Sequence, residues 1–134
     1  MKNFELTDDM LTMGGVFYPR GYAFVMFPTA EGAQQVASAM AKNPAVAEDL
    51  MLLSPEKVLK EIGQSDGESD VALPSVGTEG ATAQKYVNLA REGHHALMAK
   101  VDSDEEAEAL MQEARKHSYS YAQRYHLLAI EDLE

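Results

Sequence analysis

The chain has 134 residues, of which 46% are hydrophobic and 25% are charged, and its formal net charge is −11. This length and composition are typical of one globular domain that buries a core without covalent crosslinks, and they argue against a disordered chain. The absence of cysteine excludes disulfides, thiolate metal sites and a cysteine nucleophile. We therefore expect a single domain, residues 1–134.

The charge also bears on partners. A nucleic-acid-binding protein needs a basic field that releases counterions from phosphates, and a net charge of −11 has the opposite sign. No apolar run approaches the roughly 20 residues that span a bilayer. The first nine residues lack the basic and then apolar layout of a signal peptide. We expect a cytoplasmic protein that binds neither nucleic acid nor membrane.

Residues 1–21 predict an N-terminal arm. Their weak helical pattern is interrupted at Gly14-Gly15 and Pro19, yet their apolar content is too high for a solvated tail. We expect the arm to pack on the domain or on a second copy of it. The apolar run Tyr22–Phe27 follows, bounded by Gly21 and Pro28, and predicts a buried central strand whose two faces both need cover.

A helix, a strand and a second helix are predicted next. Thr29 is a suitable N-cap for a helix with apolar residues about every 3.6 positions, which Asn43-Pro44 ends. The apolar run 50–53 predicts the second strand. Ser54-Pro55-Glu56 then supplies a cap, a proline at the first helical position and an acidic first turn.

Residues 63–80 have no hydrophobic periodicity and predict a long loop. Its alternatives are a structural loop, a lid or partner contact, and an anion site in which Thr78 and Gly80 precede a helix N-terminus. The spacing is not a Walker A motif, because no lysine follows the second glycine. We expect the acidic first half to move and residues 71–77 to be held on the domain.

Residues 94–101 predict a third strand and residues 120–130 a long last strand. Between them, Ser103 and Glu106 form the Ser-x-x-Glu capping box of a helix. The two strand–helix stretches 22–40 and 95–114 align weakly as a duplication.

Two strand–helix–strand units predict an α+β ferredoxin-like sandwich. Its four-stranded antiparallel sheet would have the order 4-1-3-2, with the central strands 1 and 3 expected to be parallel to each other. Residues 55–93 would be a helix-loop-helix insertion between strands 2 and 3.

The segment from Gly21 to Ser54 resembles single-domain bacterial stress proteins of the general stress or heat-induced type. The shared features are the apolar strand, the alanine-rich helix and the acidic Asp49 before the second strand. The whole chain resembles small uncharacterised bacterial proteins with the same layout. The resemblance implies the fold and a stress-linked role, and it implies no catalytic residues.

Few residues suggest chemistry. A metal site needs two or three histidines that converge with a carboxylate, but the predicted strand order separates the histidine-bearing strands by roughly 10 Å. We therefore expect ordinary hydrogen bonds at the histidines, and we assign no metal and no cofactor. The candidate ligand-binding residues are His94, His95, His126, Tyr125, Thr78 and Gly80.

Three function classes remain open. The first is a non-enzymatic homo-oligomeric module with a stress-related or regulatory role; if helices do not cover the sheet face with Ala23, Val25, Phe27 and Met98, a second copy would cover it. The second is a small-ligand-binding protein or enzyme with a cleft between that face and residues 63–80, its ligand unidentified. The third is an RNA-recognition module, which the acidic charge disfavours. We expect the first.

Overall fold

The computed structural model describes residues 2–12, 15–63, 78–127 and 129–134. An α+β domain is built on a six-stranded sheet in the order β1-β3-β4-β2-β5-β6. The strands are β1 (Lys2–Asn3), β2 (Tyr22–Phe27), β3 (Met51–Leu53), β4 (His95–Lys100), β5 (Tyr121–Tyr125) and β6 (Ile130–Asp132).

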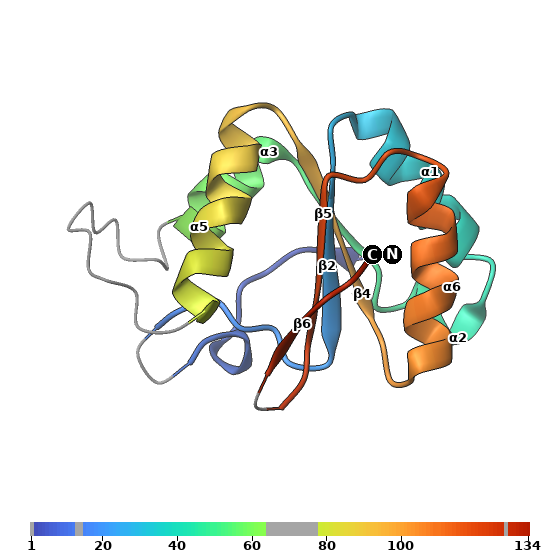
Figure 1. Cartoon of the computed structure of the whole chain (residues 1–134), viewed down its shortest axis with the longest axis horizontal. Helices are drawn as coiled ribbons and strands as arrows, with labels where there is room; N and C mark the ends of the chain where they lie inside the picture. Colours follow the sequence, from blue (N-terminus) through green and yellow to red (C-terminus); the bar gives the residue numbers. More distant parts are fainter. Residues whose placement is uncertain (1, 13–14, 64–77, 128) are drawn as a thin grey trace.

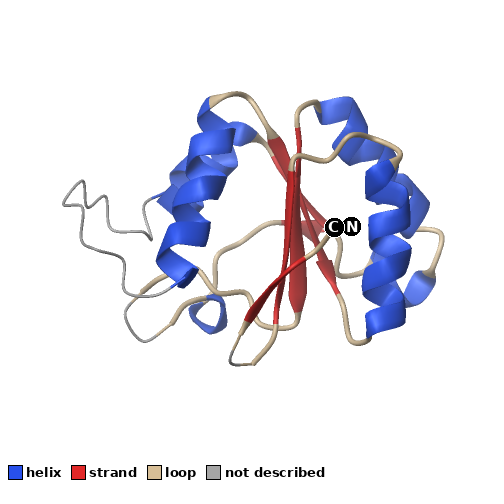
Figure 2. Cartoon of the chain, viewed as in Figure 1, coloured by secondary structure: helices blue, strands red, loops and turns tan. Residues whose placement is uncertain are grey.

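Helices lie on both sides of this sheet (Figures 1 and 2). One side carries α1 (Ala30–Met40), α2 (Pro44–Ala47) and α6 (Asp104–Arg115). The other carries α3 (Pro55–Lys57), the π-helical turn η2 (Val58–Ile62) and α5 (Thr78–Arg91). None of the helices in the described part of the chain is long and apolar enough to cross a membrane.

The sheet corrects several expectations. It has six strands rather than four, and residues 120–130 do not form one long strand, because the chain turns after Tyr125 and His126 N donates to Ala129 O. The resulting hairpin adds β6 at one edge. The central strands β2 and β4 are antiparallel, not parallel. Helix α1 connects β2 to β3, and β4 lies between these two strands. Strand β4 pairs antiparallel with both of them.

Other expectations agree with the structure. The four predicted strands lie in the expected order, as β3-β4-β2-β5. Two of the helices between β3 and β4 are α3 and α5, so a helical insertion separates these strands. Most of the predicted loop 63–80, namely residues 64–77, lies outside the described residues. The expected difference between its two halves lies there too.

Strand β2 is buried on both faces, as its apolar run predicts. Phe24 and Met26 pack into the core beneath α5, while Val25 and Phe27 pack into a second core beneath α1 and α6, and all four are 0% exposed. Helices therefore cover the sheet face with Val25 and Phe27, and the condition under which a second copy would cover that face is not met. Met98 belongs to the opposite face, where it pairs with Phe24. Because both faces of β2 are covered, an exposed sheet face no longer supports self-association, which stays a prediction.

The arm completes the core on the α5 side. Its first strand, β1, pairs in parallel with β3, and the 3₁₀ turn η1 (Asp8–Met10) follows. Phe4 and Phe17 are 1% and 0% exposed. The Phe17 ring meets those of Phe4, Phe24, Tyr86 and Tyr125 edge-on, with centroids 5.6 to 6.4 Å apart.

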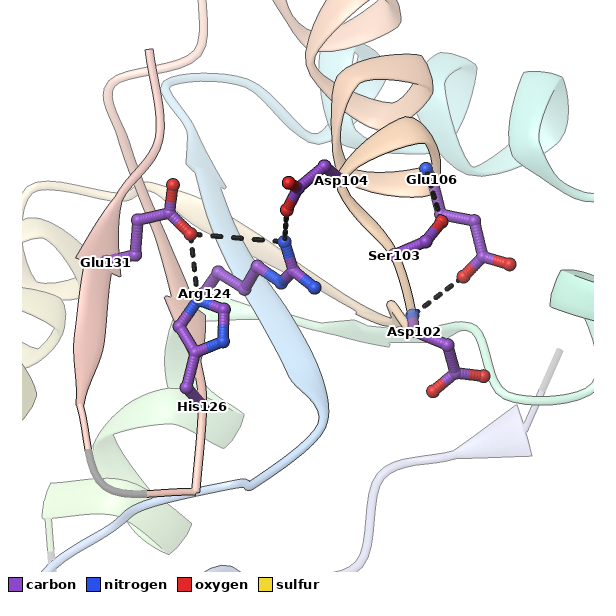
Figure 3. Close-up of polar contacts among 7 residues, drawn as sticks. All are labelled: Asp102, Ser103, Asp104, Glu106, Arg124, His126 and Glu131. Atoms are coloured by element: carbon purple, nitrogen blue, oxygen red, sulfur yellow. Dashed lines mark hydrogen bonds and ion pairs between the residues drawn. The ribbon is translucent and has the colours of Figure 1, made fainter.

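The start of α6 has the predicted cap. Ser103 Oγ accepts a hydrogen bond from Glu106 N at 3.1 Å, and Glu106 Oε1 accepts from Asp102 N at 2.7 Å (Figure 3). The glutamate thus reaches one residue beyond the N-cap, to Asp102 rather than to Ser103 as in a regular capping box. These bonds fix the end of α6 that carries Asp104.

Replacing Ser103 with alanine should lower the free energy of unfolding by about 1 kcal/mol, because the amide of Glu106 loses its acceptor. Urea denaturation followed by circular dichroism measures the change. Ser103→Asp, which keeps a capping oxygen, is the matched control and should retain most of the stability. Equal losses in both variants would contradict the cap.

Candidate functional site

A buried arginine lies beneath the start of α6. In β5, Ala122 and Arg124 point toward α6, and Arg124 is 8% exposed overall. It pairs across the sheet with Ala23, a small residue that leaves room for the long arginine stem. A charge buried to this extent requires partners.

Two carboxylates flank the guanidinium (Figure 3). Arg124 Nη1 donates to Asp104 Oδ1 at 2.8 Å and lies 3.9 Å from Glu131 Oε1. The same Glu131 oxygen is 2.8 Å from His126 Nε2. Asp104 is the first residue of α6, and Glu131 lies opposite Arg124 in β6, so the cluster joins three elements.

The guanidinium retains unused donors. The hydrogen bond to Asp104 and the ion pair with Glu131 both use Nη1, and neither Nε nor Nη2 donates a hydrogen bond to a described side chain. Among the described side chains, no fully buried nitrogen or oxygen lacks a hydrogen bond. Nε and Nη2 are therefore not completely buried, although most of the side chain is.

A pocket of about 290 Å³ adjoins Arg124 and is called the Arg124 pocket below. It lies between α6 and residues 130–134, and its lining includes Asp104, Glu108, Met111, Arg124, Glu131, Leu133 and Glu134. Arg115 links its two sides, donating to both carboxylate oxygens of Glu108 and to the main-chain oxygen of Glu134. The hydrogen bonds and charge of Arg115 lower the pKa of Glu108.

A second polar group lies at the opposite end of the sheet. His94 Nδ1 is 2.8 Å from Ser120 Oγ, and His94 Nε2 is 3.9 Å from Glu92 Oε1. This order of acid, imidazole and hydroxyl occurs in serine hydrolases. Here, however, Ser120 Oγ donates its proton to the carbonyl of Met26, so His94 Nδ1 must donate to Ser120. In this arrangement the serine proton is directed to the carbonyl and not to the imidazole.

A wider pocket, of about 510 Å³, lies at the start of α1 and is lined in part by Thr29, Gly32, Gln35 and His117. Thr29 Oγ1 already accepts from Gly32 N as the N-cap of α1. None of the residues that line it is a buried charged one. The Arg124 pocket is therefore the stronger candidate.

The structure does not bring the predicted site residues together. His94 and His95 lie at the end of the sheet where His95 pairs with Phe27, whereas His126 follows β5 at the opposite end. Thr78 and Gly80 lie in the first turn of α5. Within the described ranges, no group of three or more histidine or acidic side chains is placed to hold a metal ion.

Tyr125, also predicted, lies in the core. Its hydroxyl is 2.7 Å from that of Tyr86, and the two residues are 1% and 0% exposed. Burial is the main reason that the pKa values of both hydroxyls lie well above the ordinary value, so both are neutral in the folded protein. Tyr125 is thus held by Tyr86 and not presented to a ligand.

The residues that sequence reasoning missed are Arg124, Asp104 and Glu131. The sequence contains one signal for Arg124. This residue lies two positions after the apolar Ala122, so both occupy the same face of the strand, opposite to Tyr121, Gln123 and Tyr125. A charged residue at such a position of a half-buried strand indicates a special environment.

Fold and pocket together define an α+β protein with helices on both faces of its sheet and a charged pocket at one edge. No protein-family model matches the chain, and neither a curated protein nor a solved structure matches it. The resemblance to bacterial stress proteins stays a prediction.

Proposed function

We propose that this chain is a non-enzymatic regulatory module that binds a small charged molecule in the Arg124 pocket. The observation that carries the proposal is a guanidinium that is largely buried, lines a pocket and retains donors on Nε and Nη2. Ligand sites commonly combine a concave surface with a few placed polar groups of this kind.

Binding is favoured over catalysis by how the polar groups are held. His126 contacts Glu131, and the hydroxyl proton of Ser120 is donated to a carbonyl. His94 and Ser120 are within hydrogen-bond distance of each other, but the serine proton is directed to that carbonyl. Neither residue lines the Arg124 pocket. The ligand site also differs from the cleft expected between the sheet face and residues 63–80, because the sheet residues of that face are buried.

The fold assignment is part of the proposal. The units β2-α1-β3 and β4-α6-β5 have the connectivity of a ferredoxin-like domain. We regard β1, β6 and the helices on the α5 side as additions to that core. A regulatory role in the cytoplasm is consistent with an acidic chain without cysteine.

A nuclear magnetic resonance titration with a panel of small charged metabolites tests the proposal. At least one compound should shift the amide resonances of Arg124 and Leu133, with smaller shifts elsewhere. Arg124→Met should abolish these shifts. Arg91→Met is the matched control, since Arg91 is exposed on α5, across the sheet from α6, and its loss should change nothing. A panel that leaves the pocket amides unmoved would refute the proposal.

A further inference from the structure

The free donors of Arg124 are suited to a carboxylate. A guanidinium binds a carboxylate best through two parallel N–H groups, and Nε and Nη2 are the two that no described residue occupies. The existing partners do not compete for these two groups, because Asp104 and Glu131 both contact Nη1.

The rest of the lining favours positive charge. Five acidic residues line the pocket, but Asp132 accepts a hydrogen bond from Gln123, whose side chain faces the α5 side of the sheet. This leaves Asp104, Glu108, Glu131 and Glu134 around Arg124, with Arg115 bound to Glu108. Acidic groups outnumber basic ones, so a ligand that is only an anion would be repelled.

Size and shape restrict the ligand further. A volume of about 290 Å³ is at the lower end of ligand pockets, which suits a molecule of amino-acid size better than a nucleotide. The lining also includes the apolar side chains of Ala107, Met111 and Leu133. Such a surface packs well against a chain of methylene groups.

We infer that the ligand of the Arg124 pocket is a basic amino acid, whose carboxylate binds Arg124 and whose cationic groups face the surrounding carboxylates. This inference rests on the proposed function and specifies the chemistry of the same site. The carboxylate of the ligand contacts Nε and Nη2, its methylene groups lie along Met111 and Leu133, and the side-chain cation reaches the acidic lining that includes Glu131.

Four probes separate the parts of this inference by calorimetric and resonance titration. L-Lysine carries every group; cadaverine lacks only the carboxylate; L-norleucine lacks only the side-chain cation; L-glutamate reverses the side-chain charge. L-Lysine should bind at the pocket, and cadaverine and L-norleucine should each bind at least about tenfold more weakly, since each loses one charge-assisted contact. L-Glutamate should bind the most weakly of the four.

Variants assign the contacts. Arg124→Met should remove the difference between L-lysine and cadaverine, and Glu131→Gln should weaken L-lysine more than L-norleucine. Amide spectra and unfolding midpoints verify that both variants fold. Arg91→Met should leave all four affinities unchanged.

The possible failures are distinguishable. If L-norleucine or L-glutamate binds as tightly as L-lysine and still shifts the pocket amides, the ligand class is wrong and the proposed binding site stands. If cadaverine binds as tightly as L-lysine, the carboxylate contact with Arg124 is wrong. If none of the four probes and no compound of the wider panel shifts the pocket amides, both the inference and the proposed function are overturned.

Discussion

Replacing Phe17 with alanine should lower the free energy of unfolding by about 3–5 kcal/mol. The residue is 0% exposed, and its ring lies edge-on to four other rings, so truncation leaves a cavity at the centre of the α5-side core. Its backbone forms only an isolated bridge with Leu11, outside any helix or regular strand. Urea denaturation at neutral pH measures the effect.

The control for Phe17 is Leu127→Ala. Leu127 is 72% exposed, and its truncation should change the stability by less than about 0.5 kcal/mol. A loss at Phe17 as small as that at Leu127 would contradict the packing of the arm on the domain.

Tyr86→Phe alone should lower the free energy of unfolding by about 1–3 kcal/mol, because it leaves the buried hydroxyl of Tyr125 without its partner. Tyr125→Phe should cost a similar amount for the same reason. The double variant should be more stable than the sum of the two losses predicts, since neither hydroxyl then remains. A double-mutant cycle measures this coupling, and strict additivity would contradict the hydrogen bond.

The same pair should make the protein sensitive to alkali. Burial raises the pKa of both tyrosines in the folded state above the ordinary value of about 10. Their stabilising contribution is fully present below about pH 10 and falls as pH rises beyond it, by about 1.4 kcal/mol per pH unit for each tyrosine. The double phenylalanine variant should lose stability less steeply over this range. Equal slopes would refute the assignment.

The local features of the fold follow from the sequence. The caps at Thr29, Ser54 and Ser103 each act over three residues, so the residue types around them suffice to predict where α1, α3 and α6 begin. The unbroken apolar run of β2 likewise predicts a strand with two buried faces. In each case the signal and its cause lie close together in the chain.

The features that failed depend on contacts between distant segments. Met98 lies on the same face as Phe24 because the two residues pair across the sheet. The alternation of residues along one strand does not reveal this pairing. The candidate site depends on register too. Arg124, Asp104 and Glu131 come from β5, α6 and β6, and only the pairing of Arg124 with Glu131 and the position of α6 bring them together.

The histidines show the same limit. Histidine is a common ligand and acid–base residue, which made His94, His95 and His126 candidates. The distances between them depend on the directions of the strands. Since β4 and β5 both run antiparallel to β2, the start of β4 and the end of β5 lie at opposite ends of the sheet. Residue type therefore predicted candidates that the topology separates.

The strand order has a consequence for how the chain folds. The two neighbours of β2 are β4 and β5, both from the second half of the sequence, and β3 pairs with β4 rather than with β2. During synthesis, β2 has no ladder partner until residues 95–100 have left the ribosome, and its second neighbour is complete only after residues 121–125. Such distant pairings carry a large loop-closure cost and slow the search for the native state. Until β4 is available, the strongly apolar β2 strand stays unpaired, which leaves the nascent chain prone to aggregation.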